Sequence, residues 1–491
     1  MPANFLPSGA DYIRFLPELI MSTMGTVMMV LEGLAGEEKE RKGILFGHLT
    51  LATLIASLGA AIYAQGYAGK AFSGMLIVDG YATFFKVLVL VVGMLTVLSS
   101  YQYLRREDAE AGEYHALILF SLVGQCIMAS ANELIMVFIG LETSSIATYI
   151  LAGYLRDDKR NNESALKYFL LGSFATAFLL YGIAWIYGAA HTTHLDDIQT
   201  ALGNRDLSPN LVMVGTAAAL MFVGFAFKIS AAPFQVWAPD VYQGAPAPVT
   251  AFMSAGPKAA AFAAFVRVFM TAFSPIIDRW EPFMWSSALL TMIIGNFAAL
   301  MQSNIKRLLA YSSIAHAGYV MVAIAAHNEI GISAVMFYLA AYALMNIGAF
   351  AVVAHFARQG EKYVNVEDLS GLGWKQPVTA ALFAIFLLSF IGVPLTGGFF
   401  GKFYIFKAAL DAHLVWLSVL GLLNSAVAAY YYLRILVVMY MNEPGESMNT
   451  LQPLSTGVSL TLWAAALGTL VLGIFPSTIL SFARSSSALI K

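Results

Sequence analysis

The segment PVTAALFAIFLLSFIGVPLTGGFFGK, residues 377–402, decides the fold class. It begins as an apolar run of helix length and is then interrupted by Pro394 and the glycines around it. Proline removes a backbone donor, which leaves carbonyl groups free. Lipid tolerates such a break only where the freed groups are buried in protein or line a wet cavity. The segment therefore predicts an interrupted membrane helix, with Lys402 directly after the break.

The composition extends this interpretation to the whole chain. Of its 491 residues, 59% are hydrophobic and 11% are charged, whereas soluble proteins carry about 25% charged residues. The formal net charge is −2, and Cys126 is the one cysteine. These values exclude a soluble enzyme, a secreted disulfide-rich protein, a disordered chain and a nucleic-acid binder. They also leave no cysteine cluster for an iron–sulfur centre.

We expect an all-α polytopic membrane protein with about 14 transmembrane helices, because a span needs about 20 apolar residues. The candidate spans are 13–34, 43–64, 78–102, 114–131, 133–154, 164–188, 210–228, 247–272, 283–302, 307–326, 330–356, 377–409 (interrupted), 413–440 and 455–481. The longest polar connections, 189–209 and 357–376, are too short to fold as a soluble domain. We therefore expect a single membrane domain over residues 1–491.

The distribution of Lys and Arg predicts the orientation, because basic residues collect on the cytoplasmic side of a membrane. Fourteen lie in the connections after odd-numbered spans: Lys39, Arg41, Lys42, Arg105, Arg106, Arg156, Lys159, Arg160, Lys306, Arg307, Arg358, Lys362, Lys375 and Arg434. Six lie on the other side: Arg14, Lys70, Arg205, Arg279, Arg484 and Lys491. Both termini are thus expected on the periplasmic side.

Two short sequence matches predict an internal duplication. Ser-Ser-Ile-Ala occurs at 144–147 and at 312–315, and residues 164–170 are similar to 333–339 at nearly the same offset. The seventh and twelfth spans are also both broken by proline, at Pro233 and Pro394. We expect two inverted five-helix repeats, spans 4–8 (residues 111–275) and 9–13 (280–440). Three N-terminal helices (1–110) would precede them and a C-terminal helix (441–491) would follow. Inverted repeats with interrupted helices are typical of ion-coupled transport.

Ionisable residues inside these spans are the candidate functional residues, because each is costly in lipid and usually has a task. Glu142 and Lys258 lie deep in the fifth and eighth spans. Lys228 and Lys402 lie beside the two proline breaks. A Lys–Glu pair that opens and closes can take up and release a proton. The alternative for Lys228 and Lys402 is an amine that reaches the membrane surface.

Three further residues have competing interpretations. His316, ten residues into the tenth span, can bridge two proton carriers, or it can be a hydrogen-bonded core histidine. Lys167 is a secondary relay candidate, but Glu163 four residues earlier makes a surface ion pair nearly as plausible. Asp79 is expected to mark the end of a span.

Two other apparent motifs do not indicate a binding site. His191 and His194, with Asp196 and Asp197 nearby, have metal-ligand spacing but lie in a polar loop, so we expect no metal site. The glycines of 397–401 before Lys402 lack the Ser or Thr that a phosphate-binding loop needs after the lysine. We expect no cofactor on this chain.

With these residues in view, the chain resembles the antiporter-like membrane subunits of respiratory complex I and of multisubunit cation/proton antiporters. The resemblance covers nearly the whole chain. It rests on the stretches at 140–145, 227–246, 304–319 and 392–404. The string Pro-Asp-Val-Tyr-Gln-Gly-Ala-Pro at 239–246 and the lysine at 402 resemble the N type of NADH–quinone oxidoreductase subunit rather than the L or M types.

This resemblance implies roles for the candidates. Glu142 and Lys228 would be a coupled ion pair, Lys258 a central relay, and Lys402 the distal lysine that exchanges protons with the outside. His316 would lie on the axis joining two half-channels. FMN, iron–sulfur clusters and quinone would be held by partner subunits, and the partners would be other membrane subunits, including antiporter-like neighbours.

The function that this resemblance implies is proton translocation within an NADH–quinone oxidoreductase of the bacterial inner membrane. In this hypothesis, redox chemistry elsewhere changes the charge at one edge of the subunit. Two alternatives remain open. One is a stand-alone or multisubunit sodium/proton antiporter, and the other is a structural subunit whose buried charges join helices.

Overall fold

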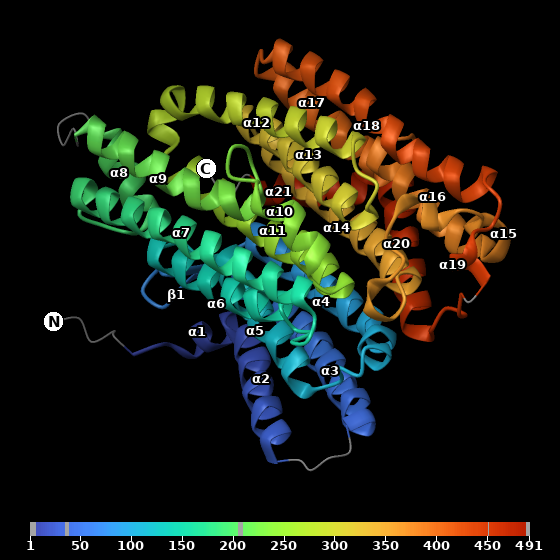
Figure 1. The fold of residues 1–491 in the computed structure, drawn as a ribbon. Coiled ribbons are helices and arrows are strands. Elements are labelled where there is room, and N and C mark those ends of the chain that lie inside the picture. Colours follow the sequence, from blue (N-terminus) through green and yellow to red (C-terminus); the bar gives the residue numbers. More distant parts are fainter. Residues whose placement is uncertain (1–5, 35–38, 205–209, 450, 488–491) are drawn as a thin grey trace.

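The computed structural model describes residues 6–34, 39–204, 210–449 and 451–487. Arg205 and Lys491 lie outside the described residues, as do the side chains of Lys39, Arg41 and Lys42. The described chain is almost entirely helical. It runs from α2 and α3 at one end of an elongated molecule to α17 and α18 at the opposite end (Figure 1).

The N-terminal part contains three long helices and a small hairpin. Its elements are α1 (Gly9–Arg14), α2 (Leu16–Leu34), α3 (Lys39–Gln65), β1 (Gly69–Ala71), β2 (Leu76–Val78) and α4 (Gly80–Arg106). The antiparallel β1–β2 hairpin is a departure from the all-α expectation. It occupies the connection before α4, where Gly69 and Gly74 have positive φ angles of 141° and 88° that favour glycine.

The middle of the chain contains the first proline break. Its helices are α5 (Gly112–Ser130), α6 (Leu134–Ala152), α7 (Lys159–Ala190), α8 (Leu195–Gly203), α9 (Leu211–Ile229), α10 (Trp237–Gly244) and α11 (Ala247–Thr271). Between α9 and α10, side chains of α12 (Ile277–Leu300) hydrogen-bond the backbone groups of Ala232. Thr291 accepts from Ala232 N at 2.8 Å, and Ser287 donates to Ala232 O at 2.6 Å. The break predicted at Pro233 is therefore present and is fully hydrogen-bonded at Ala232.

The remaining elements contain the second break. They are η1 (Ser274–Ile276), α12 (Ile277–Leu300), α13 (Ile305–Ala325), α14 (Glu329–Phe356), η2 (Gln359–Glu361), η3 (Val366–Leu369), α15 (Leu372–Lys375), α16 (Pro377–Ile391), α17 (Gly397–Asp411), α18 (Val415–Met441), α19 (Glu446–Asn449), α20 (Thr456–Ile474) and α21 (Pro476–Ser487). The expected single span over 455–481 is wrong at its C-terminal end. Pro476 prevents Phe475 from continuing α20, and a separate helix begins there.

Twelve helices of the described chain are long and apolar enough to cross a membrane. Neither α2 nor the interrupted segment, which divides into the 15-residue helices α16 and α17, is among the twelve. The nearly all-helical membrane fold is thus established, while the count of fourteen spans and the two inverted repeats stay predictions.

The core of the molecule is formed by α11, α13 and α14. The most apolar stretch of α11 is entirely buried, and those of α13 and α14 are 94% buried. In Figure 1 these helices run through the middle of the bundle, with α7, α9 and α12 outside them. A titratable residue on α11 or α13 is therefore shielded by protein on every side.

Basic residues from separate connections meet at one end of the bundle. Arg160 donates to Gly360 O at 2.8 Å, and Lys306 pairs with Glu361 at 2.6 Å. At the opposite end, Lys70 pairs with Asp196 at 2.6 Å. Arg160 and Lys306 thus lie at the same end of the bundle, while the orientation of the chain in a membrane stays a prediction.

Candidate functional site

Lys228 lies in the last turn of α9 and is 4% exposed. Its Nζ donates to Ser145 Oγ at 2.7 Å and to Tyr168 OH at 3.3 Å. The ring of Tyr168 is stacked on Trp237 of α10, with centroids 4.5 Å apart. The amine is therefore held inside the protein among aromatic rings and hydroxyls from α6, α7 and α10.

Glu142 lies on α6, three residues before Ser145, so both side chains are on the same face of the helix. Its Oε1 is buried and has no hydrogen-bond partner among the described residues. Within the same part of the chain, no ion pair shorter than 4.0 Å joins Glu142 to Lys228. The structure thus places the two residues near the same helix face but holds Lys228 on Ser145.

Lys258 lies in the centre of α11 and is 2% exposed. Its Nζ donates to Ser313 of α13, at 2.5 Å to Oγ and 3.2 Å to the backbone carbonyl oxygen. Two hydrogen bonds to neutral oxygens stabilise the amine without a carboxylate. The apolar surroundings of Lys258 in the sequence correctly indicated that it is buried.

The repeated Ser-Ser-Ile-Ala motif supplies the serines that hold these lysines. The second serine of each copy, Ser145 on α6 and Ser313 on α13, accepts a hydrogen bond from a buried amine. The two copies differ in the helix that provides the lysine, which is α9 for Ser145 and α11 for Ser313. The motif therefore marks two positions that bind an amine, although the lysines bound there do not occupy equivalent helices of the two expected repeats.

His316 is surrounded by tyrosines one turn further along α13. Its Nδ1 lies 2.5 Å from Tyr338 OH, and its Nε2 lies 3.1 Å from Tyr432 OH. Tyr432 OH also hydrogen-bonds Ser312, the neighbour of Ser313. A continuous series of hydroxyl and imidazole groups therefore extends from the residue beside Ser313 through His316 to Tyr338.

Lys402 caps the broken end of α16. Its Nζ donates to Phe390 O at 2.9 Å, to Ile391 O at 3.0 Å and to Ser425 Oγ at 2.7 Å. The C-terminus of a helix carries partial negative charge, which favours a cation there. The amine also lies 4.8 Å from the ring centroid of Tyr319. A pocket of about 460 Å³ adjoins this position, and Lys402 and Ser425 both line it.

Lys167 differs from the other lysines because carboxylates surround it. Its Nζ lies 2.7 Å from Glu163 and 2.8 Å from Asp240, which also pairs with Arg307 at 2.6 Å. Burial alone would raise the pKa of Asp240, but the hydrogen bonds from Lys167 and Arg307 outweigh it and hold that pKa below its usual value. Lys167 forms the ion pair with Glu163 that the sequence suggested. It also lines a pocket of about 280 Å³, which leaves a secondary relay role open.

Three buried ion pairs were not predicted from the sequence. Their members are Glu18–Lys86, 2.7 Å apart; Asp79–Arg267, 2.9 Å apart; and Lys306–Glu361, 2.6 Å apart. Asp79 does mark the end of a span, since it is the N-cap of α4. Lys86 and Arg267 each interrupt an apolar run, as Lys258 does, and that signal could have revealed them.

The loop with metal-ligand spacing is engaged in other contacts. Asp196 pairs with Lys70, and His194 precedes α8 in a short bridge to Glu133. Among the described residues, no group of three His, Cys, Asp or Glu side chains is placed to hold a metal ion.

The family described as NADH:quinone oxidoreductase/Mrp antiporter, TM, matches residues 131–428. NADH-quinone oxidoreductase subunit N 1 of Solibacter usitatus is 63% identical, over 100% of both chains. The chain belongs to this family. NADH-quinone oxidoreductase subunit N 2 of Koribacter versatilis is 49% identical, over 97% of both chains.

Solved structures of the family have the same fold. A chain of respiratory complex I from Thermus thermophilus with bound aureothin is 33% identical, with a TM-score of 0.81 over 95% of this chain and 99% of that one. A chain of the Mrp complex from Dietzia is 18% identical, with a TM-score of 0.85 over 98% and 97%. This second likeness shows the fold alone. Family membership makes the chain an integral membrane protein of the antiporter-like type.

Proposed function

We propose that this chain is the proton-translocating subunit N of an NADH–quinone oxidoreductase in a bacterial inner membrane. The observation that carries the proposal is a difference between buried lysines. Lys228, Lys258 and Lys402 donate to hydroxyls and carbonyls, and none has an ion pair among the described residues. Lys86 and Lys306 are locked to carboxylates.

The difference matters because an ammonium ion is costly away from water unless a carboxylate compensates it. A lysine paired with a buried carboxylate stays charged. For a lysine that faces only neutral oxygens, releasing the proton costs much less free energy, because no ion pair is broken. The hydroxyls can also orient the neutral amine. We therefore assign Lys228, Lys258 and Lys402 to proton transfer, and Lys86 and Lys306 to joining helices.

The transfer begins at Lys228. Redox chemistry on partner subunits, which hold FMN, iron–sulfur clusters and quinone, changes the charge near Glu142. Lys228 donates to Ser145 and Tyr168, and in the proposed cycle this contact represents the open arrangement of the Glu142–Lys228 pair. The repulsion between this cation and a second charged lysine is strong at low dielectric and weak in water. A proton that leaves Lys228 moves toward Lys258 through water between α9 and α11.

The next transfers use the groups around α13. Lys258 gives its proton to the hydroxyl groups of Ser313 and its neighbour Ser312. The proton then passes through Tyr432, His316 and Tyr338. Each of these groups accepts one proton as it releases another. Lys402 receives it and exchanges it with the pocket beside α17. Lys167 lies in its ion cluster at the basic, cytoplasmic end and has a secondary role in proton uptake. In this orientation both termini are periplasmic, and other membrane subunits of the complex cover part of the apolar surface.

The transported ion is the point that separates this proposal from a sodium/proton antiporter. The test uses liposomes that contain the intact complex, with NADH and quinone supplied, a pH indicator inside and radioactive sodium outside. We expect NADH oxidation to acidify the interior to the same extent in sodium and in potassium buffer. Sodium uptake linked to NADH oxidation, or acidification that requires sodium, would contradict the proposal and favour the antiporter.

A further inference from the structure

Two buried tyrosine hydroxyls near Ser313 lie outside the proposed series of proton carriers. Tyr242 of α10 is 0% exposed and Tyr342 of α14 is 3% exposed. Neither hydroxyl makes a hydrogen bond within the described part of the chain. Buried polar atoms normally have a partner, and bound water supplies it where the protein does not. The two hydroxyls therefore mark a position for water inside the protein.

The helix that carries Tyr242, α10, packs against both α7 and α13. From α7, Tyr168 accepts a hydrogen bond from Lys228. From α13, Ser313 accepts one from Lys258. Tyr242 interacts electrostatically with Tyr168, and its hydroxyl lies near that of Ser313 without the geometry of a direct hydrogen bond. Tyr242 is therefore placed between the groups that hold the two lysines.

Aromatic contacts fix the ring of Tyr242. Trp237 lies 5.9 Å from it and Phe350 lies 6.4 Å from it, between ring centroids, and both contacts are edge-to-face. Trp237 also stacks on Tyr168 at 4.5 Å. A hydroxyl hydrogen can rotate about its bond even when the ring cannot move. The Tyr242 hydroxyl can thus turn its hydrogen toward either neighbour while its oxygen stays in place.

Ser313 is suited to receive a proton from this hydroxyl. Its Oγ accepts from Lys258 at 2.5 Å, which leaves its own hydrogen free to be donated. Tyr342 also interacts with the Ser313 hydroxyl, and its ring lies 5.4 Å from that of His316. Ser313 therefore has one unpartnered tyrosine hydroxyl near it from α10 and a second from α14.

We propose that Tyr242 is the proton carrier that joins Lys228 to Lys258. Bound water bridges its hydroxyl to Tyr168 and to Ser313. The Tyr242 oxygen accepts a proton from the first water as its own hydrogen leaves to the second. Ser313 accepts that proton and passes its own to the neutral amine of Lys258. The phenol is uncharged before and after, and the inference rests on the proposed proton path.

Tyr242→Phe tests the hydroxyl, because it removes one oxygen and keeps the ring contacts. The thermal stability of the complex should be unchanged, since no protein group loses a partner. Protons pumped per NADH oxidised, measured in inverted vesicles, should fall as far as they do for Lys258→Gln. Tyr114→Phe is the matched control: Tyr114 is 1% exposed and its hydroxyl hydrogen-bonds Ser100 at 2.8 Å. It should lower stability and leave the ratio unchanged.

The same assay separates this inference from the proposed function. An unchanged ratio for Tyr242→Phe, with a lowered ratio for Lys258→Gln, would overturn the inference and leave the proposed function standing. An unchanged ratio for Lys258→Gln would overturn both.

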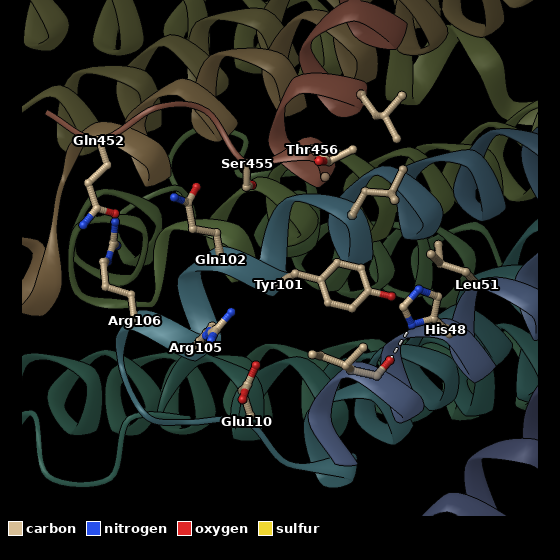
Figure 2. A pocket seen from close by; sticks show the side chains of 14 residues that line it. His48, Leu51, Tyr101, Gln102, Arg105, Arg106, Glu110, Gln452, Ser455 and Thr456 are labelled. Atoms are coloured by element: carbon tan, nitrogen blue, oxygen red, sulfur yellow. Dashed lines mark hydrogen bonds between the residues drawn. The ribbon is translucent and has the colours of Figure 1, made fainter. Parts of the chain in front are cut away.

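The bound water is tested in the wild-type complex by X-ray radiolysis, in which hydroxyl radicals formed from water oxidise nearby tyrosines. Mass spectrometry should show Tyr242 oxidised several times faster than Tyr114. Tyr101 is the positive control, because it lines a pocket of about 720 Å³ between α3, α4 and α20, with its ring directed toward His48 (Figure 2). Oxidation of Tyr242 no faster than that of Tyr114 would overturn the inference, and this result decides if Tyr242→Phe prevents assembly.

Discussion

Buried lysines in this chain differ in what they touch. Lys86 and Lys306 are within 2.7 Å of a carboxylate. Among the described residues, Lys258 donates hydrogen bonds to Ser313 alone, and Lys402 donates to a helix end and to Ser425. The charged form is stabilised in the first group by a full opposite charge and in the second by dipoles alone. Proton transfer requires a group whose two protonation states are close in free energy, which selects the second group.

Ser313→Ala tests this view at a single hydroxyl. A hydrogen bond to a charged group contributes about 1.5–3 kcal/mol, so its loss should disfavour charged Lys258 and slow proton pumping by about tenfold. Assembly should be unaffected, because the substitution removes one buried atom. Pumping is measured by fluorescence quenching in inverted vesicles, at a fixed rate of NADH oxidation. Ser313→Thr keeps the hydroxyl and should pump normally; equal pumping by Ala and Thr variants would contradict the role of the hydroxyl.

Apolar context in the sequence was sufficient to predict that Lys258 is buried, while for Lys228 it left open an amine that reaches the membrane surface. Their partners could not be predicted, because they depend on the rotation of each helix about its axis. Glu142 is an example: it shares a helix face with Ser145, yet the serine receives the amine. The aromatic surroundings of His316 depend on α14 and α18, which are distant in sequence, so the histidine alone left a core role and a relay role equally open.

Pairs of helices are held together by close backbone contact as well as by charge. Gly124 of α5 faces Gly140 and Ser144 of α6, and a Cβ at position 124 would overlap the backbone nitrogen of Ser144. Small residues permit such close approach between membrane helices. The crossing places Ser144, which hydrogen-bonds Ser121 at 3.1 Å, beside the serine that holds Lys228.

Gly124→Ala should therefore destabilise the α5–α6 contact. Overpacking of a well-packed site costs about 1–3 kcal/mol, and the clash here is with backbone that cannot rotate away. The melting temperature of the purified chain in detergent micelles should fall. Gly59→Ala is the control, since its Cβ would meet nothing within 4 Å. A Gly124→Ala variant as stable as the control would show that the helices can separate at no cost.

The Glu18–Lys86 pair joins α2 to α4 and gives a second prediction at this scale. Lys86→Met leaves Glu18 buried without its partner, which should lower the free energy of unfolding by about 3–5 kcal/mol. Replacing both residues with Met should restore most of this loss, because no charge is left unpaired. Denaturant unfolding in micelles measures both variants. If the double variant is no more stable than Lys86→Met, the loss of stability does not come from leaving Glu18 unpaired, and the prediction is wrong.

The helix breaks show what local sequence can and cannot predict. Proline at 233 and 394 indicated both interruptions, because its missing N–H and its ring act locally. Lys402 caps α16 and also contacts Ser425 of α18. The sequence could predict that Lys402 lies close to the break, but not its contact with α18. The end of α20 at Phe475 was missed because an apolar pattern continues on both sides of it.

Most basic residues of the connections, fourteen against six, are expected at one end of the molecule, and this predicts its orientation. Lys375 is exposed at that end, and Lys70, with 54% of its side chain exposed, lies at the other. In whole cells, a membrane-impermeant maleimide should label Lys70→Cys and not Lys375→Cys. Cys126 is buried and should give little background. Labelling of Lys375→Cys in intact cells would invert the orientation and with it the direction of the proposed proton path.

The central claim concerns the whole chain: buried lysines without carboxylate partners carry the protons. The most direct measurement is the number of protons pumped per NADH oxidised, in inverted vesicles from cells with Lys258→Gln. Lys306→Gln combined with Glu361→Gln is the control, because it removes a buried lysine that is paired. We predict a lower ratio for Lys258→Gln and an unchanged ratio for the control in correctly assembled complex. An unchanged ratio for Lys258→Gln would contradict the account.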